Sequence, residues 1–410
     1  MSVKDQVRYQ KAKIAIEILT EAGYQARLAG GCVRDRLLSL EPKDYDIATT
    51  AIPEQICTVF EQKNHKTIPT GIQFGTITVV IKGTPMEITT LREDVETDGR
   101  RAIVKFGTSF EKDAERRDFT INAMFEDIDG NVYDYFLGRK DIESRVLRFV
   151  GDPSLRIQED YLRILRFYRF WARFRLNPDP EALKAIKHHK DGLKIVSIER
   201  ITSEIFGLLA EKECGKALES LIEFQLLDPW IQIVKDKSVE DLTWPKNAQL
   251  DRELLVLVRL VWLTNPTSDP RGISKQLRLS TAQAKIVEFL SQHLEAIPQS
   301  SAPQSEHLFY LDRMEKVFPS IEQAHLSFLA LDPKLKRQVE HQAKVEREKG
   351  HLRSKKMAVN GHILQEKLSL KGHQIGEVLN QLKEDFYNEL WSSEEDGLAR
   401  AKFLCQDSSS

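Results

Sequence analysis

The segment Leu28–Thr50, LAGGCVRDRLLSLEPKDYDIATT, decides the fold expected for the first part of this chain. It begins with the glycine pair Gly30 and Gly31, which precedes a helical pattern that carries Arg34 one turn in. Glycines before a helix N-terminus let backbone N–H groups approach an anion closely, and the helix dipole adds to the attraction. These residues therefore predict a phosphate-binding turn.

The same segment ends in DYDIAT, a pattern typical of a strand. Because side chains alternate across a strand, Asp44 and Asp46 are predicted to present two carboxylates on one face. Two such carboxylates repel each other unless cations lie between them, and a divalent metal pair that also binds a triphosphate meets this need. A glycine turn or an acid pair alone is ordinary, but the two in this order indicate phosphoryl chemistry.

Composition limits the class of protein. A length of 410 residues suggests several domains, and 41% hydrophobic with 30% charged residues is typical of a globular protein. We find no apolar run long enough for a membrane span and no signal-peptide core in MSVKDQVRYQKAK. Four scattered cysteines favour a reducing cytoplasm and no structural zinc.

The first part of the chain mixes predicted helices and strands. The expected elements are a helix over 4–22, a strand over 25–29, a helix over 53–61, strands over 76–81 and 86–91, and a hairpin of strands 124–128 and 132–136. Between them, Arg92–Thr108 is polar and highly charged and is predicted to be an exposed, flexible loop. Glu87, in the strand MEITTL, faces away from Met86 and Ile88 and is a candidate third carboxylate for the metal cluster.

Two further strings carry charged groups suited to a nucleotide. In Glu115–Met124, ERRDFTINAM, Arg117 and Asp118 offer groups that bind phosphate and ribose hydroxyls. From Pro153 onward the chain is expected to be helical, and the first helix places acids and arginines on one stripe: Glu159, Asp160, Arg163, Arg166, Arg169 and Arg173. Its surplus of positive charge suits a triphosphate. Asp160 beside Arg163 offers an acceptor and a forked donor, an edge that can read a base without a template.

These motifs resemble the nucleotidyltransferase superfamily that includes DNA polymerase beta. More narrowly, they are similar to the class II tRNA nucleotidyltransferases and their bacterial poly(A) polymerase relatives. The resemblance is specific over residues 25–175 and extends more loosely to Ser197–Glu204, SIERITSE. It implies an α+β fold, in which a polymerase-beta-like mixed-sheet head precedes an all-α neck, body and tail.

The resemblance also implies a role for each site residue. Asp44, Asp46 and Glu87 would be catalytic, and Asp44 and Asp46 would hold Mg²⁺. The residues that bind the nucleotide would be Gly30, Gly31, Arg34, Arg117, Asp118, Asp160, Arg163, Arg166 and Arg169. The expected partners are tRNA, with ATP and CTP as substrates, and the expected compartment is the cytoplasm.

We expect the domains to divide as head 1–150, neck 151–220, body 221–330 and a tRNA-binding tail 331–410. The stretch Lys334–Lys356 holds nine Lys or Arg against three Glu and could follow an RNA backbone, although a solvated helix face is an equal reading. Val359–His362 and Leu370–His373 resemble the family's tail only in part, because Ile363 replaces an acid.

Four alternatives to full CCA addition are weighed against it. A poly(A) polymerase would share every motif, but Gly71–Phe74, GIQF, lacks the basic pair that many such enzymes carry there. An enzyme that adds only the final A is possible, whereas one that adds only CC is disfavoured because Arg92–Thr108 is retained. An inactive RNA-binding relative is disfavoured too, since such a module has no need of unpaired acids beside a polyanion.

Overall fold

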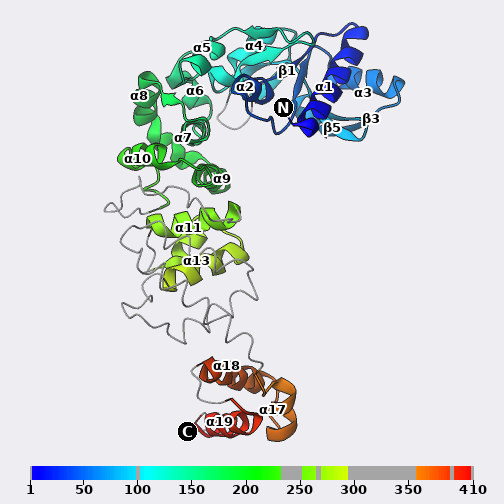
Figure 1. Cartoon of the computed structure of the whole chain (residues 1–410). Coiled ribbons are helices and arrows are strands. Elements are labelled where there is room, and N and C mark those ends of the chain that lie inside the picture. The colour runs from blue at the N-terminus through cyan, green and yellow to red at the C-terminus, as the bar shows by residue number, and fades with distance from the viewer. Residues whose placement is uncertain are drawn as a thin grey trace. The chain divides into compact units, whose positions relative to one another are not determined.

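The helix and the glycine turn predicted near the start of the chain are both present in the computed structural model. The model describes residues 2–97, 102–231, 252–264, 269–293, 357–387 and 392–407. The chain divides into two units, Met1–Leu226 and Leu227–Ser410. Figure 1 shows the described elements in chain order from blue to red.

The head of the first unit is built on one mixed sheet of seven strands in the order β3-β4-β5-β2-β1-β8-β9, and this confirms the predicted α+β class. The pairing of β2 with β5 is parallel and the other pairings in this sheet are antiparallel. The head elements are α1 (Val3–Glu21), β1 (Ala26–Ala29), α2 (Gly31–Leu37), β2 (Ile47–Thr49), α3 (Pro53–Gln62), β3 (Lys66–Gly71), η1 (Ile72–Phe74), β4 (Thr76–Ile81), β5 (Thr84–Thr90), β6 (Arg92–Thr97), β7 (Ala102–Phe106), α4 (Phe110–Glu115), η2 (Thr120–Asn122), β8 (Met124–Glu126), β9 (Val132–Asp134) and α5 (Gly138–Glu143).

Helices α1 and α3 pack together over one face of the sheet. Ile47 of β2 and Ile88 of β5 are register partners, and both are buried. Because side chains alternate along a strand, the residue before each isoleucine belongs to the opposite face. That face carries a second apolar cluster, which includes Ala48, Phe110 and Phe125.

Two local predictions in the head need correction. The strand of DYDIAT begins only at Ile47, so Asp44 and Asp46 precede it, although the Asp46 carbonyl already accepts a hydrogen bond from the Ala29 N–H at 2.9 Å. The predicted flexible loop Arg92–Thr108 instead contains an antiparallel pair, β6 with β7. Backbone pairing between its two arms outweighed the charged composition that suggested a loop.

The second part of this unit is helical from Pro153, as predicted. Its elements are β10 (Val146–Leu147), α6 (Pro153–Glu159), α7 (Arg163–Phe174), β11 (Asn177–Pro178), α8 (Pro180–His189), η3 (Lys190–Ile195), α9 (Ile198–Leu209) and α10 (Gly215–Glu223). Helix α7 packs against α9 and α10. Phe119, Phe149, Phe167 and Phe170 form an aromatic cluster that joins α7 to the head.

The single helix predicted across Asp160 is wrong, since the chain forms two helices, α6 and α7. Asp160 is extended, with φ −156° and ψ 102°. Its carboxylate accepts the N–H of Leu162 at 3.1 Å, and its carbonyl accepts the N–H of Arg163 at 2.9 Å. Aspartate often binds backbone N–H groups in this way where a helix starts, which explains the break.

The second unit is described by itself and in parts. Its elements are α11 (Arg252–Thr264), α12 (Pro270–Gln276), α13 (Thr281–His293), α17 (Gly361–Leu368), α18 (His373–Tyr387) and α19 (Glu394–Asp407). Asn360 caps α17 by accepting the N–H groups of His362 and Ile363, which gives the Asn-Gly-His string a structural role. The basic stretch Lys334–Lys356 lies outside the described residues. Within the described ranges, none of the helices has the length and apolar character required to span a bilayer.

Candidate active site

The glycine turn provides space for an arginine. Gly30 has a φ of +67° and is the residue before α2, and its N–H donates to the Met124 carbonyl at 3.0 Å. A Cβ atom at Gly30 would collide with Nη1 of Arg117 and crowd the Asn122 carbonyl at 3.3 Å. Both the backbone conformation and the close approach therefore require glycine here.

Asp46 and Glu87 lie side by side on the face of the sheet opposite α1 and α3. They precede the register partners Ile47 and Ile88, and both are exposed. The carboxylate of Asp46 reaches the surface, but protein atoms around it reduce its hydration. This desolvation, followed by the negative charges of Glu87 and Asp44, raises the pKa of Asp46 to about 6 against the opposing charge of Arg117.

Asp44 contacts the N-terminal helix. Its Oδ1 lies 3.5 Å from Nη2 of Arg8, which also donates from Nη1 to the Pro42 carbonyl at 3.3 Å. The intervening Tyr45 is buried and donates its hydroxyl to Asp5 at 2.7 Å. Helix α1 therefore contacts the chain on both sides of Asp44.

The acid group suits a divalent metal in its chemistry. Carboxylate oxygens are the hard donors that such cations prefer, and after desolvation the negative charges of Glu87 and Asp44 contribute to the raised pKa of Asp46. Across the described ranges, the side chains of His, Cys, Asp and Glu form no group of three arranged to hold an ion as they stand. Asp44 and Asp46 with Glu87 are therefore a donor set that fits a cation by charge and by type of atom.

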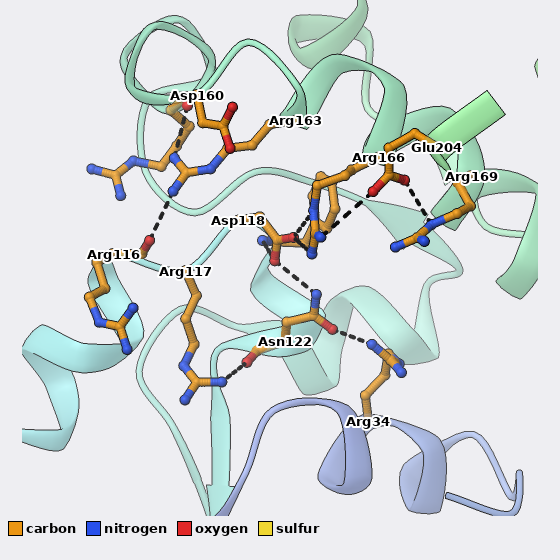
Figure 2. Close-up of polar contacts among 12 residues, drawn as sticks. Arg34, Arg116, Arg117, Asp118, Asn122, Asp160, Arg163, Arg166, Arg169 and Glu204 are labelled. Atoms are coloured by element: carbon orange, nitrogen blue, oxygen red, sulfur yellow. Dashed lines mark hydrogen bonds and ion pairs between the residues drawn. The ribbon is translucent and has the colours of Figure 1, made fainter. Parts of the chain in front are cut away.

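The string RRDFTIN forms the floor of a polar site on the head. Arg117 donates from Nη1 to the Asn122 carbonyl at 3.1 Å and from Nε and Nη2 to Asp113 at 3.2 and 2.9 Å. The Asn122 side chain donates to Asp118 at 2.8 Å and accepts from Nη1 of Arg34. Figure 2 shows Asn122 linked to Arg34, Arg117 and Asp118.

Arg34 is almost fully buried, and its guanidinium has partners on two sides. Nε donates to Asp35 Oδ1 at 2.8 Å and Nη2 to the same oxygen at 2.6 Å, and Nη1 binds Asn122. Burial lowers the pKa of Arg34, and the charge of Asp35 opposes this. The ring of Phe174 lies 4.3 Å from its Cζ. The surrounding residues therefore fix the orientation of Arg34.

The arginines of α7 meet acids supplied by other elements. Arg166 donates from Nε and Nη2 to Oδ2 of Asp118 at 3.0 and 2.6 Å, and Nε of Arg169 lies 3.0 Å from the buried Glu204 of α9. Burial alone would raise the pKa of Asp118, but Arg166, with the Asn122 amide, outweighs it and holds that pKa low. The charge surplus inferred for this stripe is thus partly neutralised by acids far away in sequence.

Asp160 and Arg163 have different partners in this structure. Asp160 Oδ2 binds Nη2 of Arg200, a residue of α9, at 2.7 Å. Arg163 binds Glu159 and donates to the carbonyls of Arg156 and Arg116 at 2.8 and 3.2 Å. The break between α6 and α7 therefore directs the two side chains to separate partners, although both reach the same pocket.

These groups line one pocket of about 420 Å³ in the first unit. Its lining residues are Gly31, Arg34, Arg116, Arg117, Asp118, Asn122, Asp160, Arg163, Arg166, Phe170 and Arg200. Two of the predicted nucleotide-binding residues do not line the pocket. Gly30 lies beneath Arg117, and the side chain of Arg169 points to Glu204. The acids lie beside the pocket, since the charge of Arg117 acts on Asp46.

Sequence reasoning did not nominate Arg116, Asn122, Phe170 or Arg200. Arg116 and Asn122 lie in the quoted RRDFTIN string, and Arg200 lies in SIERITSE, so a signal for each was present. Phe170 was not singled out, and it is 5% exposed beneath the arginines. Of the acids that orient the arginines, Asp113 lies outside every quoted string, whereas Glu204 is the last residue of SIERITSE.

A mixed-sheet head with a carboxylate group beside an arginine pocket is the arrangement of a nucleotidyltransferase. Comparison with known families agrees. Residues 26–148 match the poly A polymerase head domain, and residues 175–237 match the probable RNA and SrmB-binding site of polymerase A.

Individual relatives are similar over the same region. The zebrafish (Danio rerio) protein named CCA tRNA nucleotidyltransferase 1, mitochondrial, is 40% identical over 284 residues, which are 68% of this chain and 65% of that protein. The CCA-adding enzyme of Bacillus subtilis is 42% identical over 220 residues, or 53% of this chain and 54% of the enzyme. The chain thus spans less than two thirds of the length of these relatives.

Among solved structures, the Bacillus stearothermophilus CCA-adding enzyme in complex with CTP matches over 100% of both chains, with a TM-score of 0.73 and 26% identity. The chain belongs to the family of class II tRNA nucleotidyltransferases and bacterial poly(A) polymerases.

Proposed function

We propose that this protein adds CCA, or the terminal part of CCA, to tRNA 3′ ends from CTP and ATP without a nucleic acid template. The observation that carries the proposal is the Asp46–Glu87 pair on the sheet, with Asp44 nearby, beside an arginine pocket of nucleotide size. Relatives named for CCA addition, and a structural neighbour bound to CTP, support the choice of substrates.

Asp44 and Asp46 would hold Mg²⁺, and Glu87 would complete the acid group. Bound Mg²⁺ would supply a Lewis acid for the triphosphate. Desolvation raises the pKa of Asp46 most, and the negative charges of Glu87 and Asp44 raise it further, so a cation at this position would remove a repulsion that is already present. Glu87 would also help to activate the 3′-hydroxyl of the RNA by accepting its proton.

The pocket residues would divide the nucleotide between them. Gly31, Arg34 and Arg117 lie on the head side next to the acids and would bind the triphosphate, with Asp118 fixing the arginines around it. On the opposite wall, Asp160 and Arg163 would read the base by hydrogen bonds, which they can make by exchanging their present partners. Arg166 and Arg169 would hold the nucleotide more generally, Arg169 through the Glu204 pair that it shares with Arg166.

Two related activities remain as alternatives. The first is poly(A) polymerase activity, but this chain lacks the basic pair that many poly(A) polymerases carry at the position of Gly71–Phe74. These residues, Gly71 followed by η1, lie between β3 and β4, next to the strand that carries Glu87. An enzyme that adds only the final A would use the same pocket. The accumulated negative charge at Asp46 disfavours an inactive RNA-binding relative, because it would repel RNA unless a cation is bound.

One assay separates these possibilities. The protein is incubated with tRNAs that end at the discriminator base, at C and at CC, first with each nucleotide triphosphate separately and then with all four. Full CCA addition predicts growth by three residues on the first tRNA and none beyond A. Long A tails on every RNA would indicate a poly(A) polymerase, and absence of any extension with Mg²⁺ would contradict the proposal.

We also propose tRNA as the macromolecular partner, with the neck (151–220), body (221–330) and tail (331–410) following the acceptor arm by its shape and backbone. A cytoplasmic location is part of this proposal and rests on the scattered cysteines.

A further inference from the structure

One buried carboxylate outside the quoted motifs binds two arginines of the pocket. Asp113 of α4 is 2% exposed. Its Oδ1 accepts from Nε and Nη2 of Arg116 at 3.0 and 2.6 Å. Its Oδ2 accepts from Nε and Nη2 of Arg117 at 3.2 and 2.9 Å. Each oxygen therefore takes one guanidinium edge in a charge-assisted contact, which fixes direction as well as distance.

Asp113 is itself held by backbone groups, one of which belongs to β6. The backbone N–H of Arg92, the first residue of β6, donates to Asp113 Oδ1 at 3.4 Å. Ser109 caps α4, and its carbonyl accepts the Asp113 N–H at 3.2 Å. Burial would raise the pKa of Asp113, but the charges of Arg117 and Arg116 outweigh it and keep that pKa below its usual value. The carboxylate is therefore ionised at neutral pH.

The contact with Arg117 matters most, because Arg117 lies where the acids and the pocket meet. Asp113 binds one edge of its guanidinium and the Asn122 carbonyl binds Nη1, while Gly30 leaves room for the group above it. Arg117 is also the arginine whose charge acts on Asp46. A shift of this side chain would alter both neighbours.

We propose that Asp113 is a positioning residue that sets Arg116 and Arg117 for the phosphates of the incoming nucleotide. It does not touch the nucleotide, since it lies behind the two arginines and is absent from the pocket lining. The inference rests on the proposed function for the identity of the nucleotide. The competing explanation is that Asp113 only stabilises α4, in which case the folded variants would bind nucleotide as well as the wild type does.

The test measures nucleotide affinity directly, without RNA. Equilibrium dialysis with radiolabelled CTP and with radiolabelled ATP gives Kd for the wild type, Asp113→Asn and Asp113→Glu, and circular dichroism gives Tm. An asparagine offers a single acceptor oxygen and so cannot hold both arginines, whereas a glutamate keeps the charge but moves it by one methylene. Asp385→Asn is the matched control, because Asp385 is also buried and pairs with an arginine, Arg400 at 2.6 Å, in the other unit.

We expect Kd for both nucleotides to rise about tenfold in Asp113→Asn and about threefold in Asp113→Glu, in line with the loss of charge-assisted geometry. Asp385→Asn should lower Tm and leave Kd unchanged. Unchanged Kd in folded Asp113→Asn, with only a lower Tm, would overturn the inference while leaving the proposed function intact. If that variant does not fold, unchanged Kd in Asp113→Glu has the same meaning. Wild-type protein that binds neither nucleotide would instead contradict the proposed function.

Discussion

On the acid face of the head, which carries Asp44, Asp46 and Glu87, side chains of like charge lie close together. In the arginine pocket next to it, side chains of opposite charge are paired. On the acid face, Asp46 is crowded by Glu87 and Asp44, and its pKa rises to about 6 as a result of desolvation and of these like charges. In the pocket, Arg166 is paired with Asp118, and Arg117 with Asp113. Like charges stay close together in the first region, although Arg8 pairs with Asp44, and the second region balances charge before a ligand arrives.

This difference separates two tasks within one site. Fixed, paired arginines form a preorganised electrostatic environment that need not rearrange when the reaction begins. The clustered carboxylates remain under mutual repulsion until a cation binds. The acid face should therefore control the chemical step, and the arginine pocket should control which nucleotide binds and how tightly.

The largest effect is expected from the acid pair. Asp44→Ala or Asp46→Ala should reduce nucleotide addition on the order of a thousandfold or more, because these groups act on the reacting atoms. Affinity for tRNA, measured by filter binding, should change little, and Glu87→Gln should slow the chemical step less completely. A parallel loss of tRNA binding and activity would show that the acids support RNA binding rather than chemistry.

The β6–β7 pair provides the next test, since it lies along the chain between β5, the strand of Glu87, and α4, which precedes Arg116 and Arg117. Deletion of residues 98–101 should leave CC addition largely intact and stop addition of the final A, because the pair is expected to help reshape the base pocket between the two steps. Product lengths on tRNA lacking CCA give the answer. Equal slowing of C and A addition would make the pair merely structural, and an enzyme that adds only A lies outside this test.

Selection among the four nucleotide bases should depend on the residues of the arginine pocket and not on the acid group. Arg163→Ala should let UTP or GTP be incorporated at rates within about tenfold of CTP and ATP, because hydrogen bonds that a wrong base leaves unmade no longer exclude it. Arg166→Ala and Arg169→Ala should weaken all four nucleotides more evenly. The measurement is kcat/KM for each nucleotide on tRNA lacking CCA. If the ratio of CTP to UTP stays constant in Arg163→Ala, the base is read elsewhere.

The smallest effect concerns the folding stability that the chain loses when Asp46 is ionised. Asp46 has a folded-state pKa above its usual value of 3.8. Below pH 4 the group is protonated in both folded and unfolded chains, whereas above pH 6 the folded chain holds an unfavourable charge, so stability is lost as pH rises between these values. Without divalent metal, Asp46→Asn should raise Tm at pH 8 by about 1 to 3 °C, a modest gain because solvent screens the exposed carboxylate.

The control for that measurement is the metal itself. Added Mg²⁺ should raise the Tm of the wild type by mass action and have a smaller effect on Asp46→Asn. At pH 4 the two proteins should unfold at the same temperature. A wild type that is more stable than Asp46→Asn at pH 8 without metal would show that the carboxylate is already neutralised by protein groups.

The sequence predicted the mixed sheet and the candidate residues better than it predicted how those residues pair. Alternation along β5 correctly separated Glu87 from Met86 and Ile88, because a period of two follows from backbone geometry alone. The charge on α7 was misjudged, since Asp118, Glu204 and Asp35 reach that helix from other elements. Helical periodicity reports the neighbours within one helix and carries no information about such contacts.

The break at Asp160 was missed for a related reason. Over EDYLRILRFYRF the apolar spacing fits one helix, and a single aspartate that binds Leu162 N–H leaves that spacing almost unchanged. The pairing of Asp160 with Arg200 spans 40 residues and depends on the packing of α7 against α9. Roles assigned to the site residues remain predictions that the experiments above address.

The interruption between α6 and α7 also bears on how this chain tolerates changes in length. In one continuous helix, inserting a residue would turn everything on one side of the insertion by about 100° relative to everything on the other. Here Asp160–Leu162 separates two rotational phases. A residue gained or lost within α6 can be absorbed at this junction, so that the arginines of α7 keep their alignment with Asp118 and Glu204. Arg163 is the exception, because it contacts Glu159 and the Arg156 carbonyl of α6.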